Sequence, residues 1–543
     1  MDIERREAMQ SLAAIAAMAT LGFTGEAGAQ IAAINLAAQP FAKLDGNEKP
    51  VRGGILRVAA PVYIGFMNPN RWPVNDWISM GLIHQKLLIT DGNYRPTVPF
   101  VAESVVREGP TSALLTLRDG IQFHDGTPLN AESLKEQIAW IRDPANATFT
   151  IGWMANLDTV EVVAPLKLRW KFKEPWAAFE GVIANVPGYV LSTTALKKDA
   201  KRFETVEPKG VGPYIIEEAS PGNFLKLKRN PHYWVGKAVG RPDMPYYDGV
   251  LISVIPDPSV RLANFRAGKL DLLSLEKSQY ATVKNDKAFD VHVGPVNSVA
   301  ALRMNAVKGP CADVRVRKAI RHAIDVKALI QGTQHGLGRL ASGLYPSDHW
   351  AHDPQLKPAE FNPTLSKWLL AQAGLEKGVN IRGYVGNTTG PIEVAEAVKN
   401  MLAQVGINWQ VDALSPVAAD ARRKSLDWDL ASGGWSYIFD PDLAMTGLYH
   451  PKGSFPEGRS ELASRTALIE AARRESVPDK RQAMYRELER RFNDEYFDVW
   501  LWWDEAATAY QKWVRGYDHK ASVLHKESYS ATHSTWFANG KPG

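Results

Sequence analysis

Alternating hydrophobic and polar positions in the first third of the chain predict short strands joined by turns. Residues 112–117 and 121–123 show this alternation and are expected to be strands, with Gly-containing turns after each. A helix is expected over 131–143, because Asn130 can cap its first turn, in which Glu132 also lies. This part of the chain therefore predicts strands packed beside at least one amphipathic helix.

The second half of the chain repeats the pattern with longer helices. Apolar residues fall on one helical face over 314–331 and again over 392–402, where Gly406 ends the helix. Residues 407–411 then alternate as a strand, and 270–273 form another apolar strand after a helix. Helices alternating with strands in this way predict an α/β fold.

The length and composition restrict the class of protein. A chain of 543 residues is long enough for two or three domains, and 45% hydrophobic with 23% charged residues is typical of a globular protein. The net charge is only +5 and there is no basic run that could follow a phosphate backbone, so nucleic-acid binding is disfavoured. The 17 Trp residues are many for this length, which suggests aromatic binding surfaces as well as core.

The N-terminus has the features of an export signal. Arg5 and Arg6 precede an apolar run that is too short to span a bilayer, and small residues follow, with cleavage expected after Ala29. The arginine pair leaves both the general and the twin-arginine export routes open. Residues 1–29 are therefore expected to be a signal peptide and 30–49 a flexible mature N-terminus, and the protein is expected to be periplasmic.

Residues typical of metal sites and of catalysis are scarce. The single cysteine, Cys311, cannot form an internal disulfide and is expected to pack inside the protein. His349 and His352 have metal-like spacing, but they lie in a Pro- and Asp-rich stretch that is expected to be an ordinary surface loop. No nucleophile elbow, P-loop or H-E-x-x-H motif is present, so we expect no catalytic residue, no bound metal and no cofactor.

The stretch "GGWSYIFDPD" is the strongest candidate for a binding segment. Trp435 and Tyr437 alternate with Ser436 on a short strand, so both rings can project from one side. Asp440 and Asp442 flank a proline, which favours a turn closed by an aspartate side chain. These five residues are predicted to contact a ligand.

Seven segments in one order carry a resemblance to a known family. The chain resembles the large periplasmic solute-binding proteins of ABC importers, the peptide/nickel/opine group called family 5, from about Gly53 to about Tyr517. The segments are "GGILRVAA", "LRDGIQFHDGTPLNAESL", "GVGPYIIEE", "LKRNPHYW", "VIPDPSVRLANFRAGKLDLL", "DVRVRKAIRHAIDVKALI" and "GGWSYIFDPD".

The resemblance implies a two-lobed α/β periplasmic-binding-protein fold of the large cluster C type. Two crossover strands would join the lobes, and an extra domain would be inserted in the first lobe. The implied limits are 50–85, 208–296 and 506–543 for lobe I, 86–207 for the inserted domain and 297–505 for lobe II.

The resemblance also implies the function of a binding protein and not of an enzyme. A small organic solute, such as a peptide or a peptide-like or opine-like compound, would be held between the lobes. The loaded protein, expected to be a monomer, would deliver it to an inner-membrane ABC permease with ATPase subunits.

The family pattern is incomplete at the positions that hold peptide ends. Trp435 matches the tryptophan of the peptide-binding relatives, but Ile438 stands where those relatives have the aspartate that holds the peptide amine. The stretch "NTTGPIEV" also lacks the arginine that dipeptide-binding members carry there. Asp440 is a possible displaced anchor. A conventional dipeptide is thus disfavoured, whereas a longer peptide, an opine, a glycan or an aromatic solute stays possible.

The corresponding loop of lobe I, "NRWPVNDW", supplies a second set of candidates. Trp72 and Trp77 would face the cleft, and Asn75 and Asp76 would form a polar clamp, with Asp76 in place of the missing amine anchor. Asn297, at the start of lobe II, completes the predicted ligand-binding residues.

Two other functions are compatible with the sequence. A carrier of a nickel chelate or of haem would use the same fold, with His349 and His352 as candidate ligands. A secreted hydrolase would use Asp440 and Asp442, or Asp76, as acid and base.

Overall fold

A computed structural model describes most of the chain. The described residues are 30–31, 33, 35–36, 48–63, 67–71, 77–90, 94–95, 98–436, 438, 440–453, 455–516 and 535–539. The predicted signal peptide lies outside these residues, as does most of the predicted flexible N-terminus.

A four-stranded sheet forms the core of the predicted lobe I, and the names lobe I, lobe II and inserted domain keep their predicted limits below. The strand order of this sheet is β11-β12-β13-β2, with β13 and β2 parallel and the other neighbours antiparallel. The strands are β2 (Ile55–Ala60), β11 (Tyr214–Ser220), β12 (Phe224–Arg229) and β13 (Gly249–Val254), and the helices of this lobe are α2 (Trp77–Ile83), α7 (Trp234–Ala238), α8 (Pro258–Arg266) and α9 (Lys277–Val283).

A separate antiparallel sheet, in the order β1-β6-β7-β9-β8, lies in the predicted inserted domain, except that its edge strand β1 comes from the segment that was predicted to be a flexible N-terminus. Its strands are β1 (Gln30–Ile31), β6 (Ala102–Arg107), β7 (Ser112–Leu117), β8 (Leu157–Ala164) and β9 (Lys167–Phe172), and the helices beside it are α3 (Ala131–Arg142), α4 (Phe179–Ile183), α5 (Thr193–Lys198) and α6 (Ala200–Thr205). The predicted strand 112–117 is confirmed. The helix predicted over 131–143 is also confirmed, with its end at Arg142, and Asn130 caps it in a capping box. The strand predicted over 121–123 is wrong, because only a single bridge between Gln122 and Pro128 forms around the tight turn there.

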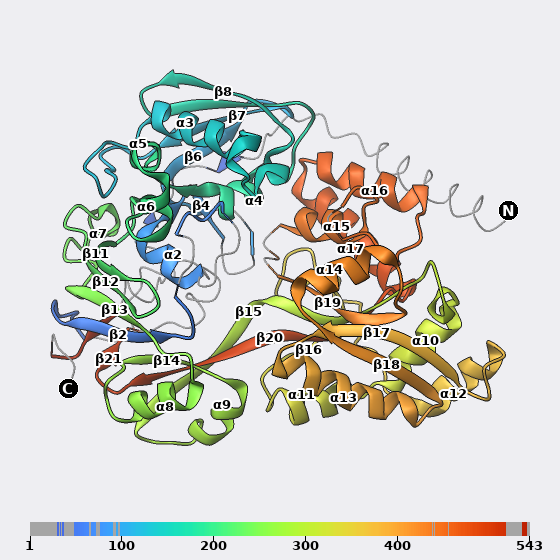
Figure 1. Cartoon of the computed structure of the whole chain (residues 1–543). Helices are drawn as coiled ribbons and strands as arrows, with labels where there is room; N and C mark the ends of the chain where they lie inside the picture. The colour runs from blue at the N-terminus through green and yellow to red at the C-terminus, as the bar shows by residue number, and fades with distance from the viewer. Residues whose placement is uncertain are drawn as a thin grey trace.

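The third sheet extends through both halves of the molecule. Two long strands, β15 (Phe289–Met304) and β20 (Asp498–Gln511), run from lobe I into lobe II and pair antiparallel with each other (Figure 1). Their register shifts between Pro295 and Val299, so the ladder is interrupted where the strands cross from one half to the other. The remaining strands are β14 (Leu272–Leu275), β16 (Arg339–Leu340), β17 (Val379–Gly386), β18 (Ile407–Leu414) and β19 (Leu430–Ser436).

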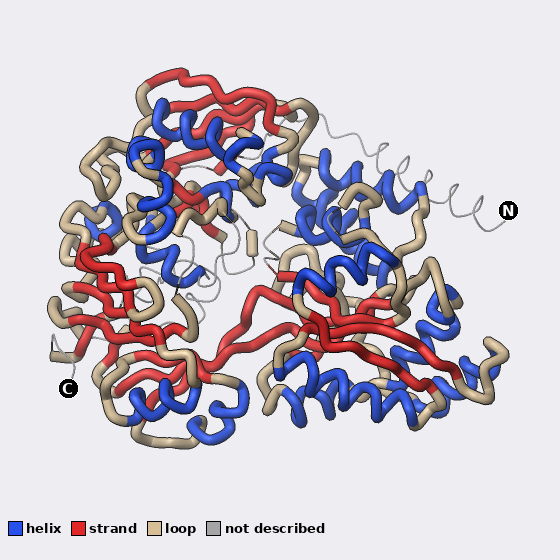
Figure 2. The backbone as a smooth tube through the Cα atoms, in the orientation of Figure 1, coloured by secondary structure: helices blue, strands red, loops and turns tan. Residues whose placement is uncertain are grey.

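Helices cover both faces of this sheet in lobe II (Figure 2). One face packs against α10 (Val314–Ala323), α11 (Val326–Thr333), α12 (Pro363–Gln372) and α13 (Thr389–Ala403), and the other against α15 (Pro441–Tyr449), α16 (Ala463–Arg474) and α17 (Pro478–Asp494), while α14 (Pro416–Ser425) follows β18. The single helix predicted over 314–331 is divided in two, because the side chain of Asp325 caps α11 and so starts a new helix. Cys311 is fully buried, as predicted.

Two buried imidazoles predict that the fold loses stability in acid. Burial lowers the pKa of His84 and of His124 to about 4, against about 6.5 in an unfolded chain. The unfolded chain therefore binds protons first. The free energy of unfolding is therefore not reduced by these two groups above pH 6.5. It falls as the pH is lowered from 6.5 toward 4, by about 3 kcal/mol for His84 alone.

Urea unfolding measured between pH 7.5 and 4 checks this expectation. The midpoint should fall with the pH, and His84→Gln should weaken that dependence, whereas substitution of the exposed His232 should leave it unchanged. Equal stability at both ends of the range would contradict it.

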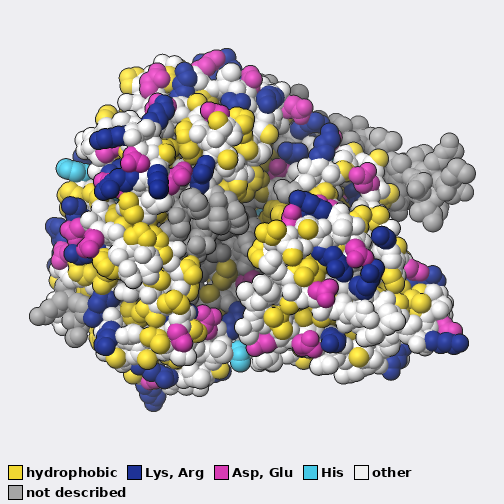
Figure 3. All heavy atoms as spheres, viewed as in Figure 1, with side chains coloured by type: hydrophobic (Ala, Val, Ile, Leu, Met, Phe, Trp, Pro, Cys, Tyr) yellow, Lys and Arg dark blue, Asp and Glu magenta, His cyan; other side chains and the backbone are white. Residues whose placement is uncertain are grey.

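No helix of the described chain is long and apolar enough to cross a membrane. Charged side chains of both signs are interspersed over the face shown in Figure 3.

Candidate functional site

Strand β19 brings the predicted binding segment to the boundary between the lobes. It lies between β15 and β17, and its residue Trp435 pairs with Val299 of the long strand β15. The indole packs edge to face on Phe455, with ring centroids 5.8 Å apart, and covers Gly447, where an added Cβ would lie 2.5 Å from the ring. Trp435 is thus partly buried and held in one orientation.

The turn after β19 is fixed by two buried side chains. Asp440 caps α15 by accepting a hydrogen bond from the Asp442 amide at 2.9 Å, so the expected Asp-Pro-Asp turn is confirmed. Both carboxylate oxygens of Asp440 also accept hydrogen bonds from the Arg481 guanidinium, at 2.7 and 2.8 Å. Asn297 accepts a hydrogen bond from the Ile438 amide at 2.9 Å. These contacts give Asp440 and Asn297 a role in shaping the loop.

An aromatic cavity of about 390 Å³ lies between lobe II and the inserted domain. This size is within the range of small-molecule sites. Lobe II contributes Trp435, Ser436 and Asp442 to its wall, and the inserted domain contributes Phe149, Trp153 and Trp176. Three predicted residues therefore meet in one cavity.

The aromatic cavity contains an ion pair between a buried carboxylate and a guanidinium that is partly exposed. The Arg473 Nε lies 3.2 Å from Asp442 Oδ1, and Thr446 donates a hydrogen bond to the same oxygen at 2.8 Å. Burial raises the pKa of the Asp442 carboxyl, and the nearby guanidinium partly offsets this effect. Four aromatic rings line the cavity beside polar side chains, Asn156 and Lys452 among them, so the cavity suits a solute that has both a flat apolar part and a polar part.

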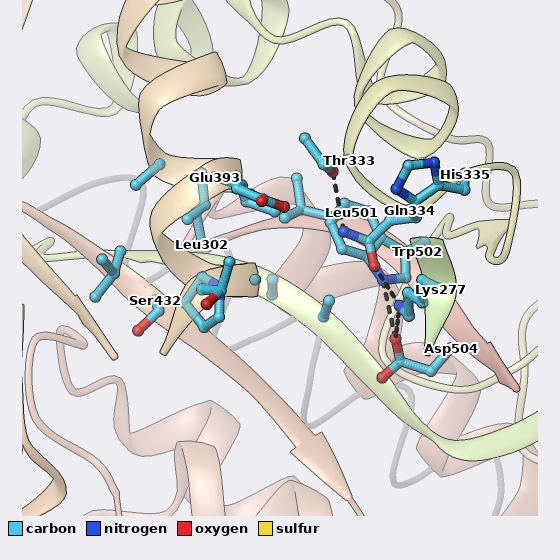
Figure 4. Close-up of a pocket in the computed structure, with 18 of the residues that line it drawn as sticks. Lys277, Leu302, Thr333, Gln334, His335, Glu393, Ser432, Leu501, Trp502 and Asp504 are labelled. Carbon is cyan, nitrogen blue, oxygen red and sulfur yellow. Dashed lines mark hydrogen bonds and ion pairs between the residues drawn. The ribbon is translucent and has the colours of Figure 1, made fainter. Parts of the chain in front are cut away.

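A second cavity, of about 500 Å³, lies at the crossover strands and is called the hinge cavity here (Figure 4). Lys277 of lobe I lines one side, the end of α11 and the start of α13 in lobe II line the other, and β19 and β20 form the floor. Its labelled lining residues are Lys277, Leu302, Thr333, Gln334, His335, Glu393, Ser432, Leu501, Trp502 and Asp504.

Polar contacts within the hinge cavity connect the two lobes. Lys277 donates a hydrogen bond to Gln334 of lobe II, and its ammonium lies 3.7 Å from the Asp504 carboxylate. Asp504 also accepts hydrogen bonds from the Trp502 indole at 2.9 Å and from Ser298 at 2.6 Å. These residues were not among the predicted ligand contacts, although the aromatic stretch "WLWWDE" lies on the crossover strand β20.

The inserted domain also contacts lobe II directly. The Ala177 amide donates a hydrogen bond to the Arg473 carbonyl at 3.0 Å, and Arg474 forms an ion pair with Glu174 at 2.8 Å. Because Arg473 also lines the aromatic cavity, these contacts close that cavity on one side.

Several predicted site residues cannot be placed in these cavities. Trp72, Asn75, Asp76 and Tyr437 lie outside the described residues. Trp77 begins α2, but its side chain is not among those described. Their roles in ligand binding stay predictions.

The two histidines of the "HWAH" stretch are buried, so the prediction of an ordinary surface loop is wrong. His349 stacks on Tyr345 with ring centroids 5.0 Å apart and accepts a hydrogen bond from the Ala351 amide. His352 lies 3.6 Å from the Glu489 carboxylate. Within the part of the chain that the structure describes, no group of three or more His, Cys, Asp or Glu side chains could hold a metal ion.

Comparison with known proteins gives concordant matches. The model of the bacterial extracellular solute-binding proteins, family 5 Middle, matches residues 97–456. The glutathione-binding protein GsiB of Escherichia coli is 26% identical over 362 residues, which cover 66% of this chain and 69% of that protein. The nickel-binding periplasmic protein of Escherichia coli is 24% identical over 468 residues, covering 81% of this chain and 87% of that protein.

A solved structure supports the fold. The periplasmic binding protein DppA of Helicobacter pylori, in complex with the peptide STSA, matches with a TM-score of 0.75 at 21% identity, over 90% of this chain and 99% of that one. The predicted two-lobed α/β fold is thereby confirmed.

Proposed function

The chain belongs to the bacterial extracellular solute-binding proteins of family 5, and from this premise we propose that it captures a small organic solute between its lobes and delivers it to an ABC permease. The solute is a peptide or a peptide-like or opine-like compound. The protein acts in the periplasm as a monomer, and the permease works with ATPase subunits. No chemical change of the solute is needed.

One observation carries this proposal: both cavities are lined from two different parts of the molecule. A solute in the hinge cavity touches lobe I at Lys277 and lobe II at Gln334, and one in the aromatic cavity touches the inserted domain and lobe II. A ligand stabilises the closed form only through contacts that exist in that form. The interrupted ladder between β15 and β20 supplies a place where the strands can bend.

The relatives support the class of solute. Their names include a glutathione-binding protein and a protein solved with a bound peptide. A conventional dipeptide is disfavoured here, because Ile438 occupies the position of the family's amine-binding aspartate and Asp440 is engaged by Arg481.

A thermal-shift screen of the purified mature protein tests the proposal. The library should contain peptides of two to nine residues, opines and small glycans, and hits should be confirmed by calorimetry and by mass spectrometry of the recovered solute. We expect saturable binding and an unchanged solute. Stabilisation by dipeptides alone would contradict the exclusion of conventional dipeptides, and recovery of a cleaved product would contradict the proposed function.

A carrier of a nickel chelate is the second candidate, because one relative is a nickel-binding periplasmic protein. Equilibrium dialysis against nickel, with and without free histidine, and against haem distinguishes it from a carrier of an organic solute. Retention of metal or haem in the absence of any organic hit would favour this candidate.

Trp435 is expected to contribute strongly to binding through the aromatic cavity. Removal of a large ring from a ligand contact costs about 1–3 kcal/mol, so Trp435→Ala should weaken binding of the solute by about fivefold to a hundredfold. Trp368→Ala is a matched control, because Trp368 lies on α12 with 57% of its surface exposed. Equal affinities of the two variants, measured by calorimetry, would exclude the aromatic cavity from the ligand site.

A further inference from the structure

Carboxylates outnumber positive groups in the hinge cavity. Glu276, Glu393 and Asp504 line it together with a single ammonium, that of Lys277, and no arginine is among its lining residues. The charge of the cavity wall therefore favours a positive group on the solute.

Two of these carboxylates already have partners. Asp504 is engaged by Lys277, Trp502 and Ser298. Glu276 forms an ion pair with Arg261 at 2.8 Å and caps α9. Neither carboxylate needs a ligand to satisfy its charge.

Glu393 differs from the other two carboxylates. It lies on the second turn of α13, and no described residue forms a hydrogen bond or an ion pair with it in this structure. Figure 4 shows its side chain extending from α13 toward Leu501 and Trp502. Glu393 is exposed to solvent at the edge of the cavity, so the cavity presents one hydrated carboxylate without a protein partner among the described residues, beside an apolar wall.

The neighbouring groups are suited to a cation. The indole of Trp502 already has the Lys277 ammonium 5.8 Å from its centroid, which shows that a positive charge can lie over this ring. An anion would find weaker partners, because Lys277 is engaged by Asp504 and Gln334, and Pro391 in the first turn of α13 has no N–H to donate.

We propose that the transported solute carries an ammonium or guanidinium group, which pairs with Glu393 in the hinge cavity while an apolar part of the solute packs on Leu302, Leu501 and Trp502. This inference rests on the proposed function and specifies its substrate class. The Glu393 carboxylate replaces, from α13, the amine anchor that the turn after β19 lacks.

The first test is a thermal-shift screen with equal numbers of cationic, zwitterionic, neutral and anionic organic solutes. The expected hits carry an ammonium or a guanidinium group, and N-acetylation of an amine hit should weaken its binding at least tenfold, as the loss of a charge-assisted hydrogen bond predicts. Hits without any positive group would overturn the inference but leave the proposed function intact. If no compound stabilises the protein and none changes its radius of gyration in X-ray scattering, the result would instead count against the proposed function.

The second test compares two glutamates on the same helix. Glu393→Gln should weaken the binding of an amine hit by about tenfold to a hundredfold, and should leave its N-acetylated analogue unaffected. Glu396→Gln is the control, since Glu396 is paired with Lys399 at 3.6 Å and does not line the cavity. Equal affinities of the two variants for the amine would overturn the role of Glu393, whatever class of solute binds.

Discussion

Asp440→Ala is expected to lower the free energy of unfolding by about 3–5 kcal/mol, because it leaves the buried guanidinium of Arg481 without its partner. The Asp440 side chain is 1% exposed and that of Arg481 is 9% exposed, so the guanidinium would be left charged in a largely buried position. The substitution also removes the cap of α15. Urea unfolding of the purified variant measures the effect.

Two further variants make this result specific. Glu161→Ala breaks an exposed ion pair with Lys171, at 2.6 Å, and should cost less than about 1 kcal/mol. The double variant Asp440→Ala with Arg481→Met should recover part of the stability, because no unpaired charge then remains. A small loss of stability together with a complete loss of solute binding would show that Asp440 is a ligand anchor after all.

Gly181→Ala is expected to separate the inserted domain from lobe II and to weaken solute binding about fivefold to a hundredfold. A Cβ at Gly181 would collide with the Cβ of Asp440 and would lie 2.9 Å from its Cγ. Such overpacking costs about 1–3 kcal/mol, and here the cost falls only on the form in which the two parts touch. The open form would be free of the clash, and alanine is the better helix former within α4.

The Gly181 variant is checked by calorimetry and by X-ray scattering at the same solute concentration as the wild type. Gly332→Ala is the matched control, because Gly332 is also helical and no atom lies within 4 Å of an added Cβ. The Gly181 variant should be less compact and bind more weakly at unchanged stability, and the Gly332 variant should do neither. Unchanged affinity in both would mean that the contact with Asp440 plays no part in binding.

Features that depend on local sequence could be predicted. The helix over 131–142 and its Asn130 cap are examples, as is the turn at Asp440, because caps and turns are decided by residues a few positions apart. The two-lobed fold was predicted from the family resemblance that the seven segments carry in their order along the chain. Local signals failed at 121–123, where a tight turn leaves no length for a strand.

The chemistry of the site could not be predicted in the same way. Asp440 looked available as an anchor because its partner, Arg481, is 41 positions away. The hinge cavity combines α9, α11, α13 and β20, which come together only through the crossover strands. The burial of His349 likewise depends on Tyr94, which is distant in the sequence. The centroids of the two rings lie 5.4 Å apart. Such long-range pairs leave no periodic signal.

The central claim is that a solute bridges two parts of the molecule and closes them. Small-angle X-ray scattering of the protein, with and without a saturating amount of a confirmed hit, tests it most directly. The account predicts a smaller radius of gyration with the solute, and a weaker response in the Gly181→Ala variant at the same concentration. An identical radius with and without a tightly bound solute would contradict it.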